Sequence, residues 1–170
     1  MDGNRLKPLA GIDAALGSAL AAMEDTRSRT LDAIAGLTDS AMDSIAPGYP
    51  NTIGATIYHI AAIEADWLYA DLLEVPYPDW LEEWFPFDVR EEDGKLSPAP
   101  GLTLDNHLSR LIKVRRHFLD EIGELDPAKF TTLNGVADNP STPRWIFHHL
   151  CQHEAEHRGQ IQAVRTLLGV

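Results

Sequence analysis

The sequence is poor in cysteine, in basic residues and in long apolar runs. Its single cysteine, Cys151, cannot form a disulfide within the chain, which suits a reducing compartment. It has 14 lysines and arginines against 26 acidic residues, a net charge of −12, which argues against nucleic acid and anionic membrane surfaces as partners. No signal peptide and no uncharged run long enough to cross a membrane are evident. We therefore expect a cytoplasmic protein that binds neither nucleic acid nor membrane.

Alternation of apolar and polar residues, the mark of strands, is missing over any useful length, whereas hydrophobic residues make up 44% of the chain. Four segments show helical spacing, with breaks and capping residues between them. They run from about Pro8 to Leu37, from Asn51 or Thr52 to Leu73, from Thr103 to Gly123, and from Thr142 to nearly Leu168. The pattern predicts an all-α fold: one domain over residues 1–170, built as an antiparallel four-helix bundle.

The connection between the second and third predicted helices, from Val75 to Gly101, is long and rich in aromatic residues. Long connections inside a compact domain often form lids or binding elements. These aromatics could equally cover one end of the bundle. If the segment is a binding element, Trp80 and Trp84 are its candidate cofactor-binding residues.

The fourth predicted helix carries two histidines four residues apart, His153 and His157. On a helix such residues lie about 40° apart on one face, so their imidazoles can bind one transition-metal ion. His149 extends this stripe to about 12 Å, which is too long for three histidines to share an ion. The chelating pair is therefore 149/153 or 153/157, and helical spacing does not choose between them.

Two histidines on one helix bind a metal weakly, so a third ligand must come from another element. The second predicted helix offers His59, which could face the pair across the core. Three imidazoles leave a coordination position open, as in catalytic rather than structural zinc sites. The alternatives are that His59 is a core histidine hydrogen-bonded to a carbonyl or carboxylate, or that the bundle binds no metal.

Two better-known metal sites use similar residue patterns. His153-Glu-x-x-His157 also matches the zinc-protease motif, but the chain lacks both the extended form of that motif and a downstream glutamate ligand. A di-iron carboxylate bundle needs two Glu-x-x-His motifs. Only Glu154 and His157 form one here, so both interpretations are disfavoured.

Several neighbours of these histidines are candidates for supporting roles. Glu154 is a candidate general base, although it lies about 100° around the helix from His153. Gln160, on roughly the face of His157, could orient a ligand or a bound water, or could simply pack. Arg158 could bind a carboxylate or form a surface salt bridge.

The sequence also allows predictions for one aspartate, one glycine and three further histidines. Asp66, two turns beyond His59, could support that imidazole by a hydrogen bond. Gly159, inside a helix, suggests close approach of a neighbouring helix. Three further histidines are expected at the surface or in support of a ligand: His107, His117 and His148.

Three segments carry a family pattern in this order: GYPNTIGATIYHIAAIEADWL, FPFDVREEDGKLSP and RWIFHHLCQHEAEHRGQIQAVRTLLG. Their most specific part is His153-x-x-x-His157-Arg-Gly-Gln-Ile, paired with a histidine in the second helix. This pattern resembles the DinB-like family of four-helix-bundle metalloenzymes, over nearly the whole chain. The resemblance implies a divalent metal held by His59, His153 and His157, with zinc or nickel expected first and iron as a further candidate. It also implies a right-handed bundle with an unusual crossover, and often a homodimer.

Relatives in that superfamily include transferases and isomerases that use low-molecular-weight thiols such as mycothiol or bacillithiol. The resemblance thus implies a metal-dependent thiol S-transferase acting on a small molecule, with the metal activating a thiol or a water. In some thiol-dependent members a glutamate replaces one histidine ligand, whereas this chain has histidine at all three positions. The alternative is a non-catalytic metal-binding or stress-response bundle.

Overall fold

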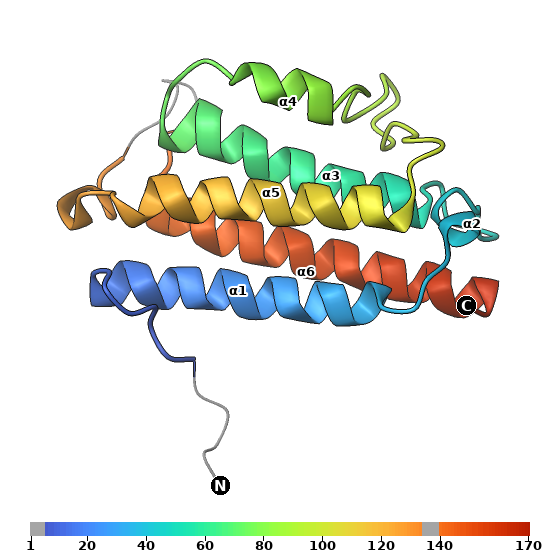
Figure 1. Cartoon of the computed structure of the whole chain (residues 1–170), viewed down its shortest axis with the longest axis horizontal. Helices are drawn as coiled ribbons and strands as arrows, with labels where there is room; N and C mark the ends of the chain where they lie inside the picture. The colour runs from blue at the N-terminus through green and yellow to red at the C-terminus, as the bar shows by residue number, and fades with distance from the viewer. Residues whose placement is uncertain (1–5, 134–139) are drawn as a thin grey trace, which may run out of the picture.

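The computed structural model describes residues 6–133 and 140–170, and four long helices dominate it (Figure 1). These helices are α1 (Ala14–Ile34), α3 (Ile53–Asp66), α5 (Leu104–Gly123) and α6 (Pro143–Leu168), and α3 continues as a π-helical turn, η1 (Trp67–Leu72). The prediction of an all-α four-helix bundle is confirmed. Among the described helices, none combines the length and the apolar character that a membrane crossing requires.

Capping residues explain most helix starts. The side chains of Thr52, Thr103 and Thr142 each accept a hydrogen bond from the first turn of α3, α5 and α6, as the sequence predicts. The predicted start of the first helix at Pro8 is wrong. Asp13 caps α1 by accepting from the amides of two following residues, so the apolar residues before it lie outside the helix.

Three short helices were not predicted: α2 (Asp39–Met42), α4 (Asp79–Trp84) and η2 (Pro127–Lys129), all inside the connections between long helices. In the described ranges, β-type pairing is limited to one isolated bridge between Arg90 and Leu96. The long connection over residues 75–101 therefore holds a helix and a tight hairpin.

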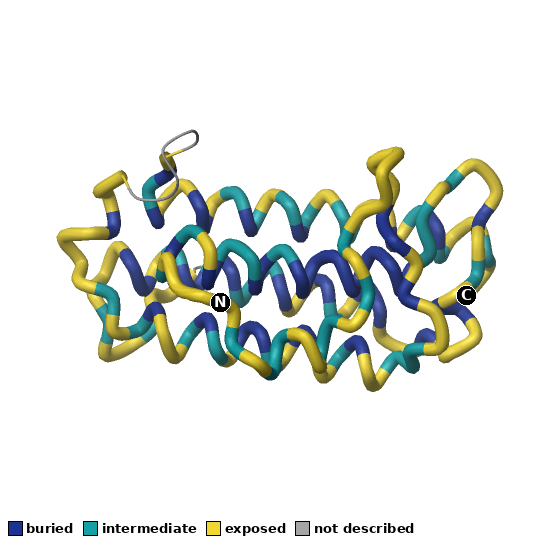
Figure 2. Tube along the Cα trace, turned by 90° about the horizontal axis from the view of Figure 1, so that it is seen from above, coloured by how far each residue is buried: buried dark blue, intermediate teal, exposed yellow. Residues whose placement is uncertain are grey.

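The long helices are arranged around the bundle in a different order from the chain. Helix α1 packs mainly on α6, α6 also packs on α3, and α3 packs on α5. Figure 1 shows α1 and α3 on opposite sides, so the connection from α1 to α3 crosses the bundle, as the resemblance implies. Figure 2 shows buried residues alternating with exposed ones along the helices, and many exposed residues on the connections. The arrangement places α3 beside α6, the two helices that carry the predicted ligands.

The aromatic connection packs onto the outside of α3 and α5. The hydroxyl of Tyr58, on α3, donates to the carbonyl of Phe87 at 2.8 Å and accepts from its amide at 3.0 Å. The ammonium group of Lys113, on α5, lies 4.5 Å from the ring centre of Trp80 and 3.8 Å from that of Trp84. These contacts fix the connection against the bundle.

Gly159 does not mark a close approach between helices, contrary to expectation. A Cβ atom added there would meet no heavy atom within 4 Å, and the residue is exposed. Gly17, in contrast, lies against a neighbouring segment, because an added Cβ would lie 2.9 Å from the carbonyl oxygen of Leu9. The segment before α1 folds back along this helix at Gly17.

Replacing Gly159 by alanine is expected to raise the free energy of unfolding by about 0.5–1 kcal/mol, because alanine loses less backbone entropy in a helix. Urea-induced unfolding followed by circular dichroism measures the change. Gly17→Ala is the matched control and is expected to destabilise the fold, since its Cβ clashes with backbone. Equal effects of the two substitutions would contradict this account.

Candidate metal centre

Helix α6 presents two histidines on one face. Pro143 occupies its first turn and Thr142 caps it, so the helix is continuous through residues 153 and 157. The ring centres of His153 and His157 are 4.5 Å apart, with the rings nearly perpendicular. Both side chains are partly buried. The i, i+4 spacing thus produces the paired imidazoles that the sequence predicts.

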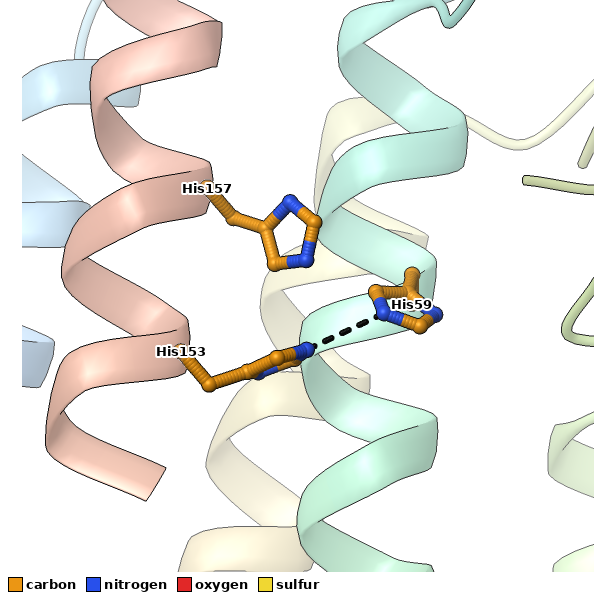
Figure 3. A group of neighbouring side chains, drawn as sticks. All are labelled: His59, His153 and His157. Atoms are coloured by element: carbon orange, nitrogen blue, oxygen red, sulfur yellow. Dashed lines mark hydrogen bonds between the residues drawn. The ribbon is translucent and has the colours of Figure 1, made fainter. Parts of the chain in front are cut away.

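Helix α3 supplies the third imidazole. His59 is fully buried, and its ring centre lies 5.0 Å from that of His153 and 4.8 Å from that of His157. One nitrogen from each of the three rings can be chosen so that all lie within 4.8 Å of one another. Figure 3 shows the three rings converging in the space between α3 and α6. The chain therefore holds a three-histidine cluster that could bind a metal ion.

Hydrogen bonds indicate which nitrogens face the cluster. The amide oxygen of Gln160 accepts from Nδ1 of His157 at 3.0 Å, which leaves the lone pair on Nε2. The Nε2 atoms of His59 and His153 are 3.0 Å apart, and Arg90, which can only donate, points a guanidinium nitrogen at the same His59 atom at 3.4 Å. Because Nε2 of His59 accepts from Arg90, its contact with Nε2 of His153 is a hydrogen bond that His153 donates, and the Nε2 atoms of these two rings meet at one place.

The protonation states also suit a metal. Burial, the neighbouring imidazoles and Arg90 lower the pKa of His59 to about 3. Burial, the imidazoles of His157 and His149, and Arg90 also lower the pKa of His153 to about 3. Burial lowers the pKa of His157, against the opposing effect of its hydrogen bond to Gln160. The three rings are therefore neutral at neutral pH, which is the form that binds metals.

Three neutral imidazoles form a donor set that accepts zinc, nickel, iron or copper. No further histidine, cysteine, aspartate or glutamate within residues 6–133 and 140–170 joins the group. The histidines, cysteines, aspartates and glutamates of these ranges would thus leave at least one position of a bound ion open.

A family model described as the DinB superfamily matches residues 22–161, which include all three histidines. The chain belongs to the DinB superfamily. A crystal structure described as a conserved protein from Enterococcus faecalis is similar, with a TM-score of 0.65 and 14% identity, over 89% of this chain and 96% of that chain. At this identity the likeness shows the fold alone. A search of curated proteins gives no match.

In this DinB-superfamily chain, the cluster contains the pair 153/157 rather than 149/153. The ring of His149 stacks on that of Trp145, with centres 5.0 Å apart, and meets the edge of Trp67 at 5.2 Å. Its centre is 6.1 Å from that of His153. Trp67 begins the π-helical turn η1, a type of helix irregularity that is frequent at functional sites. His149 and the two tryptophans form an aromatic group beside the cluster.

Glu154 lies in a buried charge network. Its carboxylate accepts from Nε of Arg27 at 2.8 Å and from Arg115 at 3.4 Å. Glu64 accepts from the same two arginines, including 2.6 Å from Nε of Arg115. Each long helix contributes one member: Arg27 from α1, Glu64 from α3, Arg115 from α5 and Glu154 from α6. We call these four residues the charge quartet.

The charge quartet has no net charge, and its four residues are buried. The exposed fraction of each member is 6% or less. Burial alone would raise the pKa of Glu64, but Arg115 and Arg27 hold it below its usual value. Burial alone would lower the pKa of Arg115, but Glu64 and Glu154 raise it. Both carboxylate oxygens of Glu154 have arginine partners, which leaves it poorly placed to take a proton at the cluster.

The three predicted cofactor-binding residues lie elsewhere. Trp80 stacks on His117, with ring centres 4.6 Å apart, and Trp84 lies under Lys113, so both face α5. Arg158 donates to the carbonyl of Thr26 on α1 at 3.3 Å. None of the three makes a contact with the histidine cluster among the described interactions.

Two further expectations are wrong. Asp66 does not hydrogen-bond His59; it accepts from the hydroxyl of Tyr77 instead. His107 is not a surface residue, because it is fully buried and both its ring nitrogens lack a hydrogen-bond partner among the described residues. Its Nε2 would lie 3.0 Å from a Cβ added to Gly54, so glycine lets α3 approach this ring.

Sequence reasoning missed Arg90 and three members of the charge quartet. Arg27 follows Leu16, Leu20 and Met23 on the buried side of α1, and a charged residue on an apolar stripe could have signalled a buried ion pair. No comparable pattern in the sequence points to Arg90. It lies in a connection, and only the hairpin over residues 89–97 brings it to the cluster.

Proposed function

We propose that this protein is a metal-dependent enzyme of the thiol S-transferase type, in which His59, His153 and His157 hold one divalent ion. The substrates are a low-molecular-weight thiol and a small electrophilic molecule, with water as the alternative nucleophile. The observation that carries the proposal is the convergence of three neutral imidazoles without a fourth protein ligand in the described chain. A closed structural site would supply that fourth ligand.

When bound, a divalent ion in such a site lowers the pKa of a thiol or water in its open position and so supplies a nucleophile at neutral pH. Gln160 accepts from Nδ1 of His157, which fixes the ring orientation and the tautomer. Burial keeps the three imidazoles neutral, so they need not lose protons to bind the ion.

Arg90 supplies a positive charge beside the same site. Its guanidinium nitrogen lies 3.4 Å from Nε2 of His59. A divalent ion, three neutral imidazoles and Arg90 together carry three positive charges, so an anionic ligand in the open position is favoured over a neutral one. A thiolate meets that requirement.

Elemental analysis of tag-free protein tests the metal. Near-stoichiometric zinc or nickel is expected in the wild type and none in the His59→Ala/His153→Ala variant. His117→Ala/His148→Ala is the matched control, because it removes two histidines outside the cluster, and it should retain the metal. No metal in the wild type after incubation with zinc or nickel would overturn the proposal.

A thiol screen tests the chemistry. The metal-loaded protein is incubated with an activated aryl chloride and with mycothiol, bacillithiol or glutathione, and loss of free thiol is followed. Turnover is expected with the wild type and not with His153→Ala, provided the variant stays folded. If His153→Ala instead unfolds and no thiol is consumed by the wild type, the ion is structural, which favours a non-catalytic metal-binding bundle.

A further inference from the structure

A cavity of about 370 Å³ lies between α3 and the connection over residues 75–101. Its wall is mostly apolar and aromatic, and its lining includes Ala62, Ile63, Asp66, Tyr77, Phe85 and Arg90. The volume falls in the range of small-molecule sites, which combine apolar walls with a few polar groups. Arg90 both lines this cavity and touches His59, so the cavity adjoins the histidine cluster.

Arg90 has no acidic partner there. No carboxylate in the described ranges comes within ion-pair distance of its guanidinium, which contacts only the carbonyl of Gly94 and the ring of His59. The hairpin that presents it is held by bonds from the amide of Glu91 to Lys95 and from that of Ser97 to Val89. Arg90 is exposed, and its guanidinium, which lacks a carboxylate partner among the described residues, can bind an anionic group in its planar fork.

An acidic residue, Asp66, lines another part of the cavity. Asp66 lies seven residues after His59 on the same helix, about 10 Å further along its axis. Its carboxylate accepts from Tyr77, which also lines the cavity. A second anionic group on the ligand would meet this negative charge, whereas an apolar group would meet Ile63 and Phe85.

We infer that the electrophilic substrate of this site carries one anionic group, bound by Arg90, and an apolar body about the size of a phenyl ring, bound in the cavity. The inference rests on the proposed function, because it names the substrate class of the same site. Arg90 acts in it as a specificity-determining residue.

Isothermal calorimetry with simple probes tests this inference. Hydrocinnamate has one carboxylate and a phenyl ring, hydrocinnamide has the ring without the charge, acetate has the charge without the ring, and phenylsuccinate has a second charge. Hydrocinnamate is expected to bind at least about tenfold more tightly than each of the others. Arg90→Gln should abolish its preference over the amide. Arg116→Gln, an exposed arginine outside the cavity, is the control for the same change in net charge.

Titrations of zinc-loaded and metal-free protein separate the two proposals. The cavity and Arg90 belong to the chain itself, so the preference for hydrocinnamate over the amide is expected in both forms. A protein that binds no zinc or nickel even after incubation with either ion, and that still prefers hydrocinnamate to the amide, would uphold the ligand class and overturn the proposed function. Stoichiometric zinc with equal affinity for acid and amide, or equal effects of Arg90→Gln and Arg116→Gln, would overturn the inference alone.

Discussion

Replacing Glu154 by glutamine is expected to lower the free energy of unfolding by about 3–5 kcal/mol, because it leaves two buried arginines with one fewer negative charge. Arg27 and Arg115 would still share Glu64, but one of the two Glu154 oxygens that accept from them would become an NH2 group, which can only donate. Urea-induced unfolding in the presence of a chelator measures the loss without a contribution from metal. Glu156→Gln, an exposed acid on the same helix, should change stability by less than about 0.5 kcal/mol.

A double-variant cycle separates charge from packing. Arg27→Met and Glu154→Met each leave an unbalanced buried charge, whereas the double variant removes one charge of each sign and keeps the Arg115–Glu64 pair. The double variant is therefore expected to be much more stable than the sum of the single losses predicts. Additive losses, or a cost below about 1 kcal/mol for Glu154→Gln, would show that the charge quartet does not act as a unit.

The charge quartet and the histidine cluster share two helices. Glu154 directly follows His153 on α6, and Glu64 lies five residues after His59 on α3. The quartet links these helices to α1 and α5 through bonds that fix rotation about each helix axis. The same rotation sets where the three imidazoles point. Buried polar networks can serve to select one arrangement of helices, and here the selected arrangement contains the cluster.

The sequence predicted the long helices because their signals are local. Thr52, Thr103 and Thr142 precede helical spacing and cap the helices that they were expected to cap. The first helix was predicted too long because Leu9 and Ile12 continue the apolar spacing. These two residues pack on the core from outside the helix, and spacing alone cannot distinguish a helix from a segment folded against it.

The site was predictable to the extent that it lies on one helix. Helical spacing offered His153 with either His149 or His157, and placed His59 as a candidate third ligand on another helix, whereas the choice of the pair 153/157 came from the family resemblance. Arg90 is 31 residues from His59 along the chain and reaches it only through the hairpin, so no local pattern reveals it. Tertiary packing, rather than propensity, decides such contacts.

The pH dependence of stability is expected to contain a contribution from His107, which lies far from any metal ligand in the sequence. Burial and Arg110 lower its pKa from 6.5 to about 4, against a smaller opposing effect of Asp43. Below pH 6.5 the unfolded chain binds a proton at this residue that the folded chain does not. Stability therefore falls as the pH drops from about 6.5 to about 4, by about 3 kcal/mol over that range.

Unfolding titrations of the wild type and His107→Leu, each at several pH values with a chelator present, isolate this contribution. Leucine cannot titrate, so the variant should lose less stability between pH 6.5 and pH 4, and the difference between the two curves belongs to His107. The cluster histidines contribute equally to both proteins and cancel. His148→Leu replaces an exposed histidine on α6 and should leave the wild-type slope unchanged. Parallel curves for wild type and His107→Leu would mean that the buried ring gains a proton as readily in the folded chain as in the unfolded one.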